Sequence, residues 1–102
     1  MRVVFSPEVE DELAELIEVL VSARYLGTYD AAVRYVSELI RTIEQTIAYK
    51  AQKVNPFLYP QYRYVVYRKS HHTYWYVFFR TVAKSGEVYY LVEHITNNHR
   101  FH

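Results

Sequence analysis

The sequence predicts an α+β fold in the order β-α-α-β-β-β, with a helical hairpin packed on one face of a small, mainly antiparallel, twisted sheet. Three observations predict it. Apolar residues recur with the period of a helix through the first half of the chain. Three later runs are rich in valine and aromatic residues and are separated by short polar segments. The length of 102 residues suits one modest core, so we expect a single domain over residues 1–102.

The chain is expected to open with a short strand that leads into an amphipathic helix. Arg2–Phe5 is rich in β-branched residues, and Ser6 then precedes a proline, as a capping residue does at the start of a helix. A helix is therefore expected to begin at Pro7. Its apolar stripe follows the 3.6-residue period and consists of Val9, Leu13, Leu16, Ile17, Leu20 and Val21.

A second helix is expected after a break at Gly27, where Thr28 and Asp30 are candidate caps. Its apolar residues recur at alternating steps of three and four: Val33, Val36, Ile40, Ile43 and Ile47, widened by Ala32, Leu39 and Ala48. Two helices joined by a short turn form an antiparallel hairpin.

The second half is predicted to be a loop over residues 51–61 followed by strands at 62–69, 74–82 and 88–96. Prolines at positions 56 and 60 keep the loop out of a helix. Alternation along the strands predicts a helix-facing set of Val65, Val77, Phe79, Leu91 and Ile95. The opposite face then carries Tyr62, Tyr64, Tyr74, Tyr76, Phe78 and Tyr90, edged by Arg68, Arg80 and His94. So many exposed rings are typical of a base-stacking platform for single-stranded RNA or of a docking site for a protein.

Charge divides the chain at its middle. Residues 1–50 carry five Lys/Arg and nine Asp/Glu, whereas residues 51–102 carry seven and two, and all five histidines lie in the second half. If the protein acts on a polyanion, its acting surface is therefore the basic half.

Several functional classes are excluded by missing motifs. The sequence has no glycine-rich phosphate loop, no nucleophile elbow and no HExxH pattern. It has no cysteine, so disulfides and thiolate metal sites are excluded, and its histidines lack the spacing of metal ligands. No cofactor or metal is expected. The apolar runs are too short to span a membrane and no signal-peptide pattern is present, so we expect a soluble cytoplasmic protein without a membrane partner.

Metal-free RNA cleavage remains open to this composition. It needs a base for the 2′-hydroxyl, cations for the charge of the phosphorane and an acid for the leaving oxygen. The basic half supplies candidates for all three roles: Lys50, Lys53, Arg63, Arg68, Arg80, His94, His99, Arg100 and His102.

Four segments of the sequence resemble the RelE/ParE toxins of bacterial type II toxin–antitoxin pairs. They are Val-Phe-Ser-Pro-Glu at residues 4–8, Tyr-Arg-Tyr-Val-Val-Tyr at 62–67, Tyr-Trp-Tyr-Val-Phe-Phe at 74–79 and Ile-Thr-Asn-Asn-His-Arg at 95–100. Their order and spacing carry the resemblance over essentially the whole chain. It implies a helical hairpin on a small twisted sheet and an antitoxin partner that wraps the toxin, and it leaves open a homodimer and a toxin–antitoxin heterotetramer.

The resemblance implies one of two activities. RelE-like toxins cut messenger RNA on the ribosome without metal, and ParE-like toxins inhibit DNA gyrase. By resemblance to the ribonucleases, Lys50, Lys53, His99 and Arg100 would be catalytic. The rings and basic residues of the strands supply the candidates for binding RNA: Tyr74, Tyr76, Arg63, Arg68, Arg80 and His94. One position departs from that pattern, because Trp75 stands where those enzymes carry an arginine.

From these observations the sequence predicts a toxin that cleaves messenger RNA on the ribosome, inhibits translation and so arrests growth. A gyrase inhibitor of the same fold and a non-toxic binding module remain as alternatives.

Overall fold

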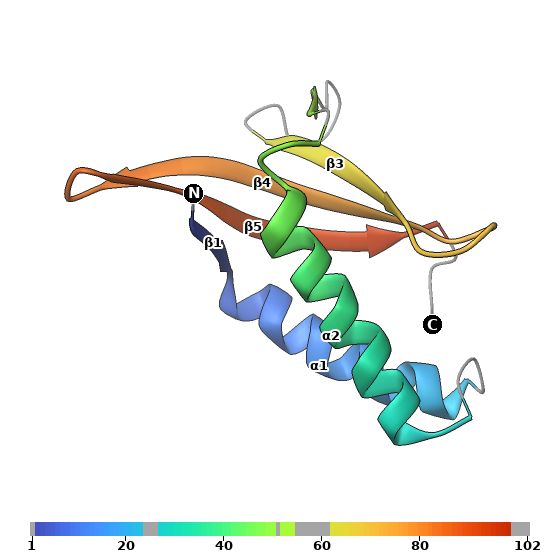
Figure 1. Cartoon of the computed structure of the whole chain (residues 1–102). Coiled ribbons are helices and arrows are strands. Elements are labelled where there is room, and N and C mark those ends of the chain that lie inside the picture. Colours follow the sequence, from blue (N-terminus) through green and yellow to red (C-terminus); the bar gives the residue numbers. More distant parts are fainter. Residues whose placement is uncertain (1, 24–26, 51, 55–61, 99–102) are drawn as a thin grey trace.

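The computed structural model describes residues 2–23, 27–50, 52–54 and 62–98. Over these residues the chain forms an α+β fold with two helices packed on a five-stranded mixed sheet (Figure 1). The elements are β1 (Arg2–Phe5), α1 (Pro7–Ser22), α2 (Tyr29–Thr46), β2 (Lys53–Val54), β3 (Arg63–Arg68), β4 (Tyr74–Lys84) and β5 (Glu87–Asn97). The predicted α+β class is confirmed. No helix in the described ranges is both long and apolar enough to cross a membrane.

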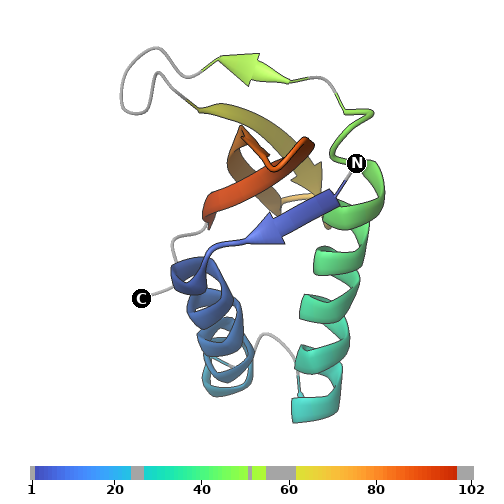
Figure 2. The ribbon, with the colours of Figure 1, turned by 90° about the vertical axis from the view of Figure 1, so that its left-hand side faces the viewer.

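The sheet has the strand order β1-β5-β4-β3-β2, and both helices lie on the same side of it (Figure 2). The pairs β2–β3, β3–β4 and β4–β5 are antiparallel, whereas β1 runs parallel to β5. The two-residue strand β2 corrects the prediction that residues 51–61 form only a loop. Lys53 and Val54 precede the first proline of that segment, so their backbone is free to pair with the edge of β3.

Both helices begin at the residues that the capping pattern indicates. The Ser6 hydroxyl accepts a hydrogen bond from the backbone N–H of Val9 at 3.2 Å, and Thr28 accepts one from Ala31 at 3.1 Å. Each bond satisfies an N–H that has no partner within its helix.

The core lies between the helices and the near face of the sheet. The helices contribute Val9, Leu13, Leu16, Leu20, Ala32, Val36, Leu39 and Ile43, with Ile47 just after α2, and the sheet contributes Val65, Tyr67, Trp75, Val77, Phe79 and Val92. These residues are the principal source of stability, because burial of apolar surface is the dominant favourable term in folding.

Strand β5 does not follow the simple alternation that the sequence predicts. Phe78 pairs with His94 but Phe79 pairs with Val92, so Glu93 is an extra residue on β5. A bulge of this kind shifts the alternation of side chains by one residue. Val92 is consequently fully buried on the helix side.

The bulge overturns three further face assignments. Tyr90 packs on the core, with its ring centroid 5.1 Å from that of Phe79, instead of lying on the opposite face. Leu91 is the register partner of Arg80 and so lies on the face away from the helices. Glu93, which alternation placed toward the helices, also contacts side chains on the far face.

The turn between β4 and β5 is a tight one. Ser85 and Gly86 both have positive φ, 52° and 79°, as the two central residues of a type I′ hairpin turn require. Glycine adopts this conformation without strain, whereas serine does so at a cost.

Candidate functional site

The sheet face that points away from the helices, called the open face below, carries a continuous run of rings. Tyr64 lies 6.4 Å from Tyr76 and 5.3 Å from Phe78 between ring centroids. The ring of His94 lies edge-on to Phe78 at 6.5 Å and to Tyr62 at 5.6 Å. Four of the six rings predicted for this face take part in these contacts. A fifth, Tyr74, lies on the same face because it is the register partner of Arg68. Tyr90 is the exception.

A charged cluster lies beside His94 on the open face. The carboxylate of Glu93 accepts a hydrogen bond from the Tyr62 hydroxyl at 2.6 Å and another from Nε of Arg80 at 2.5 Å. The bulge produces this cluster, because it allows the consecutive residues Glu93 and His94 to contact the same face. We call Tyr62, Arg80, Glu93 and His94 the bulge cluster.

Electrostatics favour the charged forms of Glu93 and Arg80 within the bulge cluster. The hydrogen bond from Tyr62, and then that from Arg80, lower the pKa of Glu93 below its ordinary value. The bond to Glu93 in turn raises the pKa of Arg80. The contact with Glu93 uses only Nε, and a guanidinium has five N–H donors. Arg80 therefore retains donors that could meet a phosphate.

The other predicted cations of the open face lie at its borders. Lys53 is the register partner of Tyr64 and is exposed on the edge strand β2. Arg68, at the end of β3, donates to the carbonyl of Ser70 at 3.2 Å and to Nδ1 of His71 at 2.8 Å. Lys53 and Arg68 thus flank the aromatic run, with Arg68 already bound to the neighbouring turn.

Lys50 and Arg63 lie on the helix side of the sheet. Nζ of Lys50 lies 4.7 Å from the ring centroid of Tyr67, a core residue. Arg63 is exposed and is the register partner of the buried Phe79. The structure therefore does not bring Lys50 together with Lys53. The predicted catalytic residues His99 and Arg100 lie outside the described residues, as does His102.

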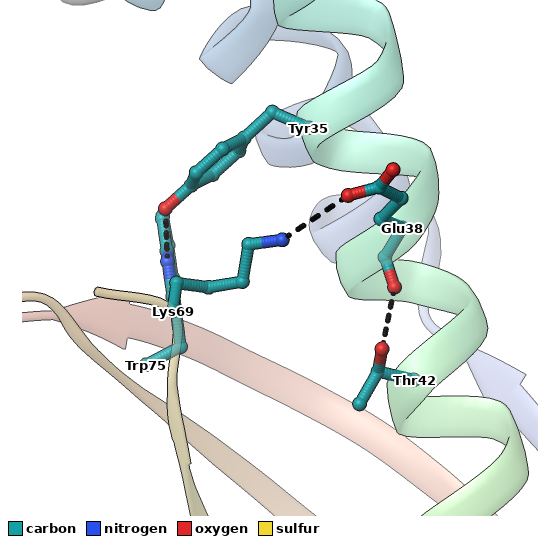
Figure 3. Close-up of polar contacts among 5 residues, drawn as sticks. All are labelled: Tyr35, Glu38, Thr42, Lys69 and Trp75. Atoms are coloured by element: carbon teal, nitrogen blue, oxygen red, sulfur yellow. Dashed lines mark hydrogen bonds and ion pairs between the residues drawn. The ribbon is translucent and has the colours of Figure 1, made fainter.

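Trp75 is part of the core, so its side chain is not on the open face. It is 4% exposed, and its indole N–H donates to the hydroxyl of Tyr35 at 2.9 Å. Figure 3 shows Trp75 and Lys69 converging on Tyr35 of α2, where Nζ of Lys69 lies 4.6 Å from the ring centroid and 3.6 Å from a carboxylate oxygen of Glu38. Trp75 thus joins β4 to α2.

Sequence reasoning missed Glu93 as a member of the site. Strict alternation assigned it to the helix side, where a carboxylate would have been buried among apolar residues. Glutamate is almost never fully buried unless it is paired. That conflict is the signal that could have indicated a bulge at this position.

The described residues offer no evident metal site. Within them, no three His, Asp or Glu side chains gather as the ligands of a metal ion would. The chemistry available to the bulge cluster is instead proton transfer by His94 and charge stabilisation by Arg80.

Comparison of the chain with protein-family models, with curated proteins and with solved structures gave no match.

Proposed function

We propose that this chain is the toxin of a type II toxin–antitoxin pair and that it cleaves messenger RNA on the ribosome. The fold supports this proposal, because a helical pair on one face of a mainly antiparallel sheet is what the resemblance to RelE/ParE toxins implies. The observation that carries the choice of RNA is the bulge cluster. It places a histidine and an arginine beside the run of half-buried rings on the same face.

In this proposal the open face binds the RNA strand and the bulge cluster lies at the scissile phosphate. Bases stack on rings such as Tyr64 and Tyr76, and Lys53 contacts the backbone at the border. With strands about 4.8 Å apart, β2 lies roughly 10 Å from β4, so a strand of RNA that crosses the sheet would meet both Lys53 and Arg80.

Cleavage then proceeds through attack by the 2′-hydroxyl on the adjacent phosphorus. His94 accepts the proton of that hydroxyl as the new O2′–P bond forms, and Arg80 stabilises the charge of the phosphorane. The P–O5′ bond breaks, which leaves a 2′,3′-cyclic phosphate, and the leaving O5′ takes a proton from an acid. His99, which the resemblance implies to be catalytic, is our candidate for that acid, and this part remains a prediction because His99 lies outside the described residues.

Glu93 and Tyr62 act as positioning residues. Glu93 fixes the guanidinium of Arg80 through Nε, and Tyr62 holds the carboxylate of Glu93 while its ring supports that of His94. A guanidinium held in one orientation stabilises developing charge better than a mobile one, because no reorganisation is needed during the reaction.

The test is induction of the protein in bacterial cells without its antitoxin. We expect growth arrest, with new messenger RNA ends that map inside translated codons. Arg80→Gln and His94→Gln should each reduce cleavage by roughly 100-fold or more, the usual effect of losing a charge-stabilising donor or a proton-transfer group. Arg41→Gln, on the exposed surface of α2, is the matched control and should leave cleavage unchanged.

A second candidate is inhibition of DNA gyrase without nuclease activity. Two observations favour it. Arg68 and Arg80 both already contact acceptors within the protein, and the position that carries arginine in the ribonucleases holds the buried Trp75. The aromatic run would then bind a protein. Growth arrest with intact transcripts and broken DNA would favour this candidate, and unimpaired growth would favour a non-toxic binding module.

A further inference from the structure

A hollow opens at one end of the sheet, where the β4–β5 turn lies beside β1. It has a volume of about 320 Å³, which is at the lower end for ligand sites. Its walls come from three separate segments: Arg2 and Val4 of β1, Lys84 and Ser85 at the turn, and Glu87 and Tyr89 of β5. The side chains have a mixed character, with two cations, one carboxylate, one ring and one hydroxyl.

Pairing of the strands brings the two cations together. Arg2 is the register partner of Tyr89 in the parallel β1–β5 pair, and Lys84 is the partner of Glu87 across the hairpin. Both cations are exposed, and neither makes an ion pair within the part of the chain that the structure describes. Two cations on the walls of one hollow, neither of them in an ion pair with the Glu87 carboxylate beside them, are suited to a phosphate group.

The remaining walls suit a nucleobase. Tyr89 is half-buried, so one part of its ring lies open to the hollow, and bases stack on such rings irrespective of their identity. Glu87 supplies a carboxylate that only accepts hydrogen bonds. Guanine is the one common RNA base that presents two adjacent N–H donors, N1–H and N2–H, on its Watson–Crick edge.

We propose that this hollow binds one nucleotide of single-stranded RNA, with its phosphate on Arg2 and Lys84, its base against Tyr89 and a preference for guanine set by Glu87. The hollow lies on the open face, as the bulge cluster does, because Lys84 and Arg80 have the same orientation along β4. Arg80 and Lys84 are four residues apart on β4, a distance of roughly 13 Å along a strand. That distance corresponds to a neighbouring stretch of the same RNA strand.

The role of the hollow in an RNA substrate rests on the proposed function, whereas the binding of a nucleotide does not. The experiment therefore uses guanosine 5′-monophosphate alone, without ribosomes and without cleavage. In a titration followed by amide chemical shifts of the labelled full chain, we expect saturable shifts centred on Ser85, Gly86 and Glu87. Uridine 5′-monophosphate should bind roughly tenfold or more weakly, the usual discrimination of a bidentate contact to one base.

Variants test two parts of the proposed contact, the phosphate and the edge of the base. Arg2→Gln combined with Lys84→Gln should weaken guanosine monophosphate binding by roughly tenfold, and Glu87→Gln should remove the difference between the two nucleotides. These residues are exposed, so the variants should keep the fold. Arg34→Gln, on the exposed surface of α2, is the matched control and should bind as the unaltered chain does.

Two results would overturn the proposal. One is the absence of saturable shifts at the β4–β5 turn. The other is equal binding of both nucleotides, together with a loss of binding in the Arg34→Gln control as large as that in the Arg2→Gln, Lys84→Gln variant. That result would mean non-specific attraction to basic residues. If the nucleotide binds while messenger RNA stays intact, the proposed function fails and the nucleotide site stands. If messenger RNA is cut while the nucleotide does not bind, the proposed function stands and the nucleotide site fails.

Discussion

Replacement of Val92 by threonine tests the bulge on which the candidate site depends. Threonine is close to valine in shape and favours strands, but it adds a hydroxyl group. Val92 is 0% exposed and lies among apolar side chains of the core, so the new hydroxyl would be buried without an evident partner. A buried hydroxyl without a hydrogen bond costs about 1–3 kcal/mol in proteins. We therefore expect the free energy of unfolding to fall by about 2 kcal/mol.

The assay is urea unfolding followed by the fluorescence of Trp75, which is the only tryptophan and lies in the core. The urea concentration at the midpoint should fall, while the slope of the unfolding free energy against urea concentration stays the same because the native fold is unchanged. Val88→Thr is the matched control on the same strand, since Val88 is 44% exposed, and it should change stability by less than about 0.5 kcal/mol.

Simple alternation along β5 makes the opposite prediction, because it places Val92 on the open face and Glu93 toward the helices. Under that arrangement Val92→Thr would be as mild as Val88→Thr. Equal stabilities of the two variants would thus refute the bulge and, with it, the cluster of Arg80, Glu93 and His94.

Three further predictions concern stability. Trp75→Phe removes the donor to Tyr35 and should lower the free energy of unfolding by about 1 kcal/mol in urea unfolding followed by far-ultraviolet circular dichroism, since this variant has no tryptophan, and Tyr35→Phe added to it should cost little more because the hydrogen bond is already lost. Tyr62→Phe removes the largest cause of the lowered pKa of Glu93. A carboxyl group whose pKa is lowered on folding stabilises the folded state at pH values above its unfolded pKa of about 4.5, and this contribution is lost as the pH falls through its folded pKa. The variant should therefore be less stable than the unaltered chain at about pH 7, and the difference in stability should shrink as the pH falls below 4.5. A constant difference from about pH 7 to about pH 3 would contradict this cause. Gly86→Ala should destabilise by about 1 kcal/mol on thermal unfolding, because alanine is strained at a φ of 79° although its Cβ would meet nothing within 4 Å; a neutral effect would show that the turn relaxes.

The helical half follows from local sequence signals. Ser6 and Thr28 cap the helices through their own side chains, and the apolar periodicity of each helix faces a single sheet. These signals act over three or four residues, so they can be identified without knowledge of tertiary contacts.

The candidate site depends on pairing between distant segments and could be predicted only in part. The face of Tyr64, Tyr76 and Phe78 follows from alternation within each strand. The position of Glu93 does not, because a bulge is defined by how β4 pairs with β5 and leaves no strong mark in β5 alone. Trp75 is a mixed case: alternation places it on the same side of β4 as Val77 and Phe79, but its hydrogen-bond partner, the hydroxyl of Tyr35 on α2, depends on tertiary packing.

The most direct test of RNA cleavage at the bulge cluster is the chemistry of the RNA ends that the purified protein produces on ribosomes programmed with a defined messenger RNA. Attack by the 2′-hydroxyl predicts a 5′-hydroxyl on the downstream fragment and a 2′,3′-cyclic phosphate or 3′-phosphate on the upstream one. Both products should disappear with His94→Gln and persist with Arg41→Gln. Intact messenger RNA, or fragments with a 5′-phosphate and a 3′-hydroxyl, would contradict the proposed function.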